Sequence, residues 1–209
     1  MPSMFQHIQK TMGHAVVLSV TGLTGPAGSA GAKPLFDGLH FDLPAGVTAL
    51  TGDEGTGKTS LLRLLAGDLS AMSGRVSGAP DDVFWLDLQG AEHDQTTVQA
   101  CWDALRSRYP RWNEELLQDL AEAFDMEQHR HKRLNMLSAG SRRKVMITAA
   151  LACGATVTLL DQPFAALDLK SIRAIKDFLN EAAEQPGRAW IVADNEAPVD
   201  LPLGSVLRL

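Results

Sequence analysis

Residues 52–59 read GDEGTGKT, a segment whose residue types and spacing suit the binding of phosphate groups. The pattern G-x-x-x-x-G-K-[ST] needs its glycines because the backbone must turn tightly and direct N–H groups at phosphate oxygens. Lys58 would place a positive charge on the outer phosphates of a nucleotide, and the Thr59 hydroxyl would suit Mg²⁺. A helix that starts here adds the positive end of its dipole. The segment therefore predicts nucleotide binding in preference to a simple glycine-rich turn.

The loop also contains two acidic residues, Asp53 and Glu54. Two carboxylates beside a polyphosphate would weaken binding unless their side chains face solvent.

A second candidate site lies at Asp161, where the apolar run TVTLLD at 156–161 ends. P-loop NTPases place an aspartate at the end of such a buried strand to hold Mg²⁺, often through water. Alone, an aspartate at a strand end is usually a turn or cap residue. Together with the phosphate loop, Asp161 predicts a magnesium site.

Elements that would position these residues alternate along the chain. Apolar runs predict strands, and apolar residues at helical spacing predict helices. From Thr97 to about Ala150 there is no strand pattern, and apolar residues at helical spacing predict two helices separated by Pro110. Alternating strands and helices predict a mostly parallel sheet, here with a helical block inserted in the middle. The expected strands are 14–20, 39–43, 47–50, 82–88, 156–161 and 189–194, and the expected flanking helices are 58–66 and 169–183.

Composition limits the class of protein. The chain has 209 residues, 45% of them hydrophobic and 21% charged, which fits one large or two small globular domains. This excludes long disorder, collagen-like repeats and a coiled-coil rod. The net charge of −6 disfavours a general nucleic-acid binder. The two cysteines, Cys101 and Cys153, are too far apart for a CxxC motif, and we expect both to be buried as small apolar residues.

Two apolar stretches could be taken for a transmembrane helix or for a signal peptide. Residues 145–160 lack charge but span only 16 residues, which is short for a transmembrane helix. Residues 15–23 could imitate the apolar part of a signal peptide. A first strand followed by a glycine-rich turn is the simpler interpretation, because Thr21, Gly22 and Thr24 interrupt the run.

The phosphate loop, the segment LSAGSRRKV at 137–145 and TLLDQPFAALD at 158–168 together resemble the ATP-binding cassette (ABC) ATPases. The resemblance covers about residues 15–195. In length and texture the chain is similar to the small ATPase subunits of bacterial ABC transporters, such as the haem exporter of cytochrome c biogenesis. The resemblance implies an α/β P-loop NTPase core, an N-terminal antiparallel β subdomain and a helical subdomain inserted at about 90–150. All three would belong to a single ATP-binding domain, 1–209.

The resemblance also implies roles for individual residues. Gln89 stands at the glutamine-loop position and would sense Mg²⁺ and the transmembrane partner. Ser138, Ala139 and Gly140 belong to the signature, which would contact the γ-phosphate held by the opposite subunit. Asp168 would be a dimer-contact residue. Mg²⁺ would be held by Thr59, Gln89 and Asp161, and the ATP phosphates by Gly52, Asp53, Glu54, Gly55, Thr56, Gly57, Lys58, Thr59 and Ser60.

Several positions depart from the family pattern. In the signature, Ala139 replaces a glycine and Ser141 replaces a glutamine. Gln162 stands where the family has a catalytic glutamate, and Asn195 stands near the position of the switch histidine. All six histidines precede residue 132, so no histidine can fill that role. The region that should supply an aromatic residue for adenine, 29–31, holds none, and Phe36 is a candidate substitute.

Catalysis would therefore depend on Gln162, Gln89 and Asn195. Gln162 cannot accept a proton, and loss of a general base typically costs about 10²–10⁴-fold in rate. Phosphoryl transfer depends mostly on positioning and charge stabilisation, however, and a glutamine can orient water. Slow hydrolysis therefore remains compatible with the sequence.

The resemblance favours the ATPase subunit of a transporter, paired head to tail with itself or a second ATPase subunit. Such a subunit would bind ATP and Mg²⁺ and dock a permease at the cytoplasmic face of the membrane. The alternative is a degenerate subunit that binds ATP and dimerises but hydrolyses little. A soluble ABC protein of translation or DNA repair usually carries two cassettes or long coiled coils, and this chain has neither. A P-loop kinase would not need the segment LSAGS.

Three other groups of residues allow two interpretations each. Trp102, Tyr109 and Trp112 could form a docking surface for the permease, or they could belong to the core. His129 and His131 could bind a metal, but a solvated basic stretch is the simpler interpretation. For Arg142, Arg143 and Lys144 a solvent-facing helix is favoured over a nucleic-acid contact.

Overall fold

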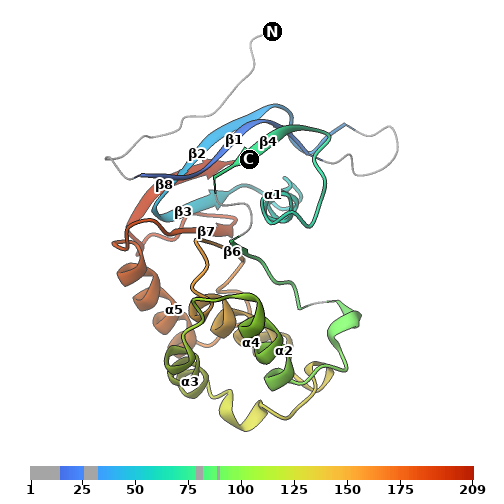
Figure 1. Ribbon diagram of the computed structural model, residues 1–209, viewed down its shortest axis with the longest axis vertical. Helices are drawn as coiled ribbons and strands as arrows, with labels where there is room; N and C mark the ends of the chain where they lie inside the picture. Colours follow the sequence, from blue (N-terminus) through green and yellow to red (C-terminus); the bar gives the residue numbers. More distant parts are fainter. Residues whose placement is uncertain (1–14, 26–32, 79–81, 89) are drawn as a thin grey trace.

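The computed structural model describes residues 15–25, 33–78, 82–88 and 90–209. It contains a three-stranded and a five-stranded sheet together with a group of helices. The three-stranded sheet lies at one end of the molecule and helices α2, α3 and α4 lie at the other, with the parallel strands between them (Figure 1). The elements are β1 (Val16–Thr24), β2 (Leu39–Pro44), β3 (Gly46–Thr51), α1 (Lys58–Leu65), β4 (Ser73–Ser77), β5 (Val83–Phe84), η1 (Ala91–His93), α2 (Val98–Arg108), α3 (Glu114–Ala123), η2 (Glu127–His129), η3 (Leu134–Met136), α4 (Ala139–Ala152), β6 (Val157–Asp161), α5 (Leu169–Ala182), β7 (Ala189–Asp194) and β8 (Leu203–Arg208).

The five-stranded sheet is parallel, with the order β5-β6-β7-β3-β8. Its central strands are buried on both faces, as the continuous apolar runs in the sequence predict. Leu159 and Ile191 face the core under the antiparallel sheet and α1, whereas Leu160 and Val192 face the core under the inserted helices. The sheet therefore separates two hydrophobic cores, and the predicted α/β architecture is confirmed.

The antiparallel sheet has the order β2-β1-β4. Its first strand, Val16–Thr24, supports the interpretation of the N-terminal apolar run as a strand. The sequence did not predict β4, because its residues SGRVS are almost all exposed and lack an apolar alternation. β4 is an edge strand that is defined by pairing with β1 and not by burial.

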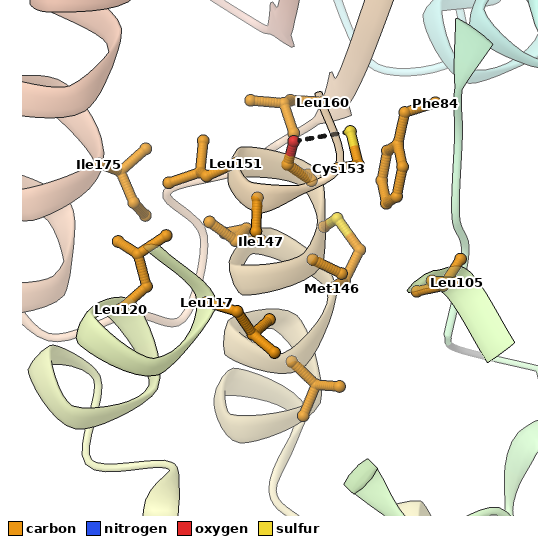
Figure 2. Packing of buried hydrophobic residues seen from close by; sticks show 14 of the residues in the cluster. Phe84, Leu105, Leu117, Leu120, Met146, Ile147, Leu151, Cys153, Leu160 and Ile175 are labelled. Carbon is orange, nitrogen blue, oxygen red and sulfur yellow. Dashed lines mark hydrogen bonds between the residues drawn. The ribbon is translucent and has the colours of Figure 1, made fainter. Parts of the chain in front are cut away.

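The inserted helices begin with side-chain caps. Thr97 Oγ1 accepts a hydrogen bond from the backbone N–H of Ala100 at 3.2 Å, and Asn113 Oδ1 accepts one from Leu116 at 3.0 Å. Helix α4 supplies the centre of this core, where Met146, Ile147 and Leu151 point toward the neighbouring helices and strands (Figure 2). The predicted helical subdomain is therefore present, with its elements between residues 91 and 152.

Two of the three aromatic residues considered for permease docking lie in this core. Trp102 is 1% exposed and donates its indole N–H to the Val145 carbonyl at 3.0 Å. Tyr109 is 4% exposed, and its hydroxyl donates to the Val83 carbonyl at 3.1 Å. Trp112 is half-buried. The docking surface proposed for these residues is wrong, because burial removes Trp102 and Tyr109 from any partner.

The predicted strand 82–88 is much shorter in the structure, where only Val83 and Phe84 pair with β6. Trp85 to Leu88 leave the sheet and line a cavity instead. Cys101 and Cys153 are free and buried, as expected, and burial raises the pKa of each thiol to about 11. Within the described ranges, no helix combines the length and the apolar character that a membrane span requires.

Candidate nucleotide-binding site

The phosphate loop connects buried strand β3 to helix α1, the context that the sequence predicts. Gly57 is the N-cap of α1 and has a φ of 101°, in the left-handed region that favours glycine. A side chain there would also meet Leu35 at 3.1 Å. The side chains of Asp53 and Glu54 are exposed, as phosphate binding would require, and Ser60 lies half-buried in the first turn of α1.

The Lys58 side chain is folded back over the loop. Its Nζ donates to the carbonyl oxygens of Gly52 at 2.6 Å and Asp53 at 2.9 Å, and to Asn195 Oδ1 at 3.2 Å. Lys58 is only 7% exposed, and these three oxygens satisfy its buried ammonium group. The same contact places Asn195, at the end of β7, beside the phosphate loop. The sequence-predicted residues Lys58 and Asn195 are thus brought together across 137 positions of the chain.

Thr59 and Asp161 also meet, although they are 102 residues apart in the chain. The Thr59 hydroxyl donates to Asp161 Oδ2 at 2.5 Å. Burial raises the pKa of Asp161, and the Thr59 hydrogen bond and the charge of Lys58 oppose this rise. A hydroxyl and a carboxylate side by side are the hard oxygen ligands that Mg²⁺ prefers. The residues present therefore fit a magnesium ion at this point.

Gln162 follows Asp161 directly and has a φ of 45°, which is unusual for a residue other than glycine. Its backbone N–H donates to the Ala193 carbonyl at 2.8 Å, so the turn is fixed to β7. Its side chain is exposed beside Asp161. This arrangement places a neutral amide where the family resemblance implies a catalytic carboxylate.

The signature residues form the start of α4. Ser138 is the N-cap, and its Oγ accepts from the Ser141 backbone N–H at 3.1 Å. Gly140 packs so closely on the next loop that a Cβ would lie 2.4 Å from the Ala166 carbonyl oxygen. Ser138 and Ala139 are exposed. In its own chain, Ser138 therefore acts as a helix cap with its side chain open to solvent.

Asp168 is the N-cap of α5 and accepts from the Ser171 backbone N–H at 2.9 Å. It also pairs with Lys144 Nζ at 2.7 Å. The hydrogen bond from Lys144, with help from Ser171, holds the pKa of Asp168 far below its usual range. Asp168 thus connects α4 to α5 within one chain.

The interpretation of Arg142, Arg143 and Lys144 as a solvent-facing stretch is wrong. Arg142 pairs with Asp94 at 2.9 Å and is 13% exposed, while Lys144 is 15% exposed. Arg143 Nη1 donates to the Ala165 carbonyl at 2.5 Å. Consecutive helix positions point in different directions, so each of the three cations finds a different partner. No periodic pattern in the sequence predicts these contacts, because polar contacts between segments leave no apolar pattern.

Three further expectations concern aromatic residues, the glutamine loop and metals. Gln89 and residues 29–31 lie outside the described residues. Phe36 is only 8% exposed and packs next to Gly25, so its ring has no free face for an adenine base. The neighbouring Leu35 is 42% exposed and lies beside Gly57 of the phosphate loop. Across the described part of the chain, no group of three His, Cys, Asp or Glu side chains could hold a metal ion.

A cavity of about 210 Å³ lies beside the site and was not predicted. One wall is the segment 85–88, which leaves the sheet after β5. Arg142, Arg143 and Met146 of α4 also line it, together with Asp161 and Gln162 at the end of β6. The cavity therefore borders both the end of β6 and the first half of α4.

Comparisons with known proteins agree with this geometry. The profile of the ABC transporter family matches residues 36–165, which is more than half of the chain. The cytochrome c biogenesis ATP-binding export protein CcmA of Cupriavidus pinatubonensis is 30% identical over 194 residues, covering 87% of this chain and 84% of that protein. CcmA of Ruegeria pomeroyi is 30% identical over 192 residues, covering 88% of both chains.

Among solved structures, an ABC transporter ATP-binding protein from Pyrococcus furiosus has a TM-score of 0.72 at 21% identity. The match covers 92% of this chain and 96% of that one, and it concerns the fold. A second solved ATP-binding subunit of an ABC transporter has a TM-score of 0.73 at 20% identity, over 85% of this chain and 79% of that one. Taken with the phosphate loop and its aspartate partner, these matches show that the chain belongs to the ABC transporter family and is a small ABC-type ATPase similar to CcmA.

Proposed function

We propose that this chain binds Mg-ATP in the loop 52–60 and hydrolyses it slowly as a head-to-tail dimer that drives a membrane permease. The contact between Thr59 and Asp161 carries the proposal, because it joins the start of α1 to the end of β6 beside Lys58. A cation, a hydroxyl and a carboxylate at one helix N-terminus are suited to a nucleotide polyphosphate with its metal.

Each of these residues has a distinct role. The glycine backbone of the loop and the N-terminus of α1 direct N–H groups toward the phosphates. Lys58 neutralises the outer phosphates after it exchanges its present oxygen partners for phosphate oxygens. Thr59 and Asp161 would hold Mg²⁺, which supplies charge neutralisation at the phosphate oxygens when bound. Gln89 is proposed as a further magnesium contact from its position in the sequence.

Gln162 would orient the attacking water by hydrogen bonding without accepting its proton. Asn195 would add a neutral hydrogen-bonding group near the outer phosphate, since its amide already contacts Lys58 at 3.2 Å. Neither residue can act as a strong base, and so we expect slow turnover.

Dimerisation is proposed from the exposure of Ser138 and Ala139, whose side chains have no part in the phosphate loop of their own chain. A head-to-tail pair would place Ser138 and Gly140 against the nucleotide of the opposite chain, with Asp168 close to the contact. The N-terminus of α4 supports this role, because its free N–H groups suit an anion.

A permease partner is proposed from the family and from the export function in the names of its CcmA relatives. The chain would then act as a single ATP-binding domain, 1–209, at the cytoplasmic face of the membrane.

Isothermal titration calorimetry with Mg-ATP tests the nucleotide site. We expect Lys58→Ala to remove most of the binding, whereas Lys170→Ala, at a position 66% exposed on α5, should bind like the unchanged chain. Thr59→Ala should weaken binding in Mg²⁺ more than in EDTA, since only the metal needs the hydroxyl. Equal affinity of the unchanged chain and Lys58→Ala would overturn the assignment.

A further inference from the structure

We infer that Arg143 is a positioning residue for Gln162, because it holds the loop 162–168 in the shape that directs Gln162 toward the nucleotide. The inference rests on the proposed function in one respect, namely that Gln162 orients the attacking water. It assigns a role to a side chain of α4 that follows the signature serine, Ser138, along the same helix.

The loop that carries Gln162 has an unusual backbone. Gln162 has a φ of 45° and Ala166 has a φ of 59°, so two residues other than glycine lie in the left-handed region within five positions. Such residues persist only where the surrounding structure holds them. The loop therefore needs contacts from neighbouring elements to keep its shape.

Several contacts hold it, among them the ion pair between Lys144 and Asp168 at its end. The Gln162 N–H donates to the Ala193 carbonyl at 2.8 Å, and the Ala165 N–H donates to the Gln162 carbonyl at 3.2 Å. Gly140 packs directly against the Ala166 carbonyl. Arg143 Nη1 donates to the Ala165 carbonyl at 2.5 Å. Lys144 holds the end of the loop at Asp168, whereas Arg143 supplies the charged contact nearer to Gln162. A charge-assisted hydrogen bond is stronger than a neutral one.

The position of Arg143 relates it to the reacting end of the site. Arg143, Asp161 and Gln162 line the same cavity. Ala165, whose carbonyl accepts from Arg143, also donates its own N–H to the Gln162 carbonyl at 3.2 Å. Loss of the Arg143 contact would therefore first change the backbone of the turn that directs the Gln162 side chain.

Gln162 depends on this direction more than a glutamate would. A glutamate can accept a proton from water and so contributes chemistry as well as orientation. A glutamine contributes orientation alone, and a misplacement of about 1 Å can cost roughly 10²-fold in rate. The hydrogen bond from Arg143 to the Ala165 carbonyl, called the tether below, is therefore needed for the rate of ATP hydrolysis as well as for the stability of the loop.

Hydrogen exchange of the nucleotide-free chain tests the tether without reference to activity. In Arg143→Ala we expect the amides of Gln162 and Ala165 to exchange at least ~10-fold faster, because the loop opens more often. Amides in β7 and α5 should keep their protection. Arg143→Lys should lie between the two, and Arg173→Ala, at an exposed position of α5, should match the unchanged chain. Unchanged exchange at Gln162 and Ala165 in Arg143→Ala would overturn the inference.

A double-mutant cycle on single-turnover ATP cleavage tests the route through Gln162. We expect Arg143→Ala to lower the rate by about 10–100-fold with unchanged ATP affinity, and Arg143→Lys to recover part of it. In the Gln162→Ala background, the same change should cost less than ~3-fold, because no side chain remains to be positioned.

An equal cost in both backgrounds would show that Arg143 acts by another route and would refute the inference. Failure of the unchanged chain to bind ATP would refute the proposed function instead. The hydrogen-exchange result would still show whether Arg143 holds the loop 162–168.

Discussion

Replacing Gly140 by alanine has two opposing effects on the free energy of unfolding, and the close packing around Gly140 determines which of them is larger. In a helix interior, alanine is favoured over glycine by about 0.8–1.0 kcal/mol, and less in a first turn. The added Cβ, however, would lie 2.4 Å from the Ala166 carbonyl oxygen, where ordinary contact begins at 3.4 Å. The missing 1.0 Å must come from backbone on both sides, and overpacking of this kind costs about 1–3 kcal/mol.

We therefore expect Gly140→Ala to lower the free energy of unfolding by about 1–2 kcal/mol after the helix gain is subtracted. For a chain of this size, that corresponds to a fall in Tm of roughly 2–8 °C. Thermal unfolding followed by circular dichroism, without nucleotide, measures it. Ala139→Ser, at the exposed neighbouring position, is the control and should change stability by less than about 0.5 kcal/mol. An unchanged or higher Tm in Gly140→Ala would refute the idea that α4 is closely packed on the loop 162–168.

Three further predictions follow from other contacts. Gln162→Glu restores a group that can polarise water and should raise ATP turnover at least ~10-fold in a phosphate-release assay, with Gln162→Ala as the control; an unchanged rate with intact ATP binding would mean that another step limits turnover. Trp102→Phe removes the indole hydrogen bond to α4 and part of a fully buried side chain, so it should lower the free energy of unfolding by about 1–3 kcal/mol in urea titrations, and no loss would contradict its core position. Burial alone would raise the pKa of Asp82, but hydrogen bonds, those from Thr156 foremost, hold this pKa below its usual value. The ionised Asp82 therefore stabilises the fold above about pH 4, and this contribution is lost as the pH falls further. The free energy of unfolding, measured from pH 6 to pH 3, should fall less in Asp82→Asn than in the unchanged chain.

The parts of the fold that depend on burial could be predicted from the sequence. Strands such as Val157–Asp161 are buried on both faces, and so their apolar runs reveal them directly. The phosphate loop and Asp161 could be predicted because the chemistry of phosphate and metal restricts the residue types. By contrast, β4 is an exposed edge strand without an apolar pattern, so the sequence does not reveal it. Residues 85–88 have the apolar residues of a strand but leave the sheet and line a cavity, so the predicted strand is too long.

The roles of the three cations at 142–144 could not be predicted, because each depends on a contact far away in the chain. Arg142 meets Asp94, Arg143 meets Ala165 and Lys144 meets Asp168. A single sequence shows neither the direction of each side chain nor which carbonyl or carboxylate lies opposite. For the same reason, Trp102 could be read equally as a surface anchor or as a core residue.

The three oxygens around Lys58 have a consequence for how the chain senses an occupied site. The Lys58 ammonium group does not face solvent, because it donates hydrogen bonds to oxygens of Gly52, Asp53 and Asn195. A phosphate that pairs with Lys58 must therefore displace at least one of these oxygens, and the longest of the three hydrogen bonds is the one to the Asn195 amide at 3.2 Å. Binding of a phosphate would then break an internal hydrogen bond at the end of β7 as well as form new ones at the loop.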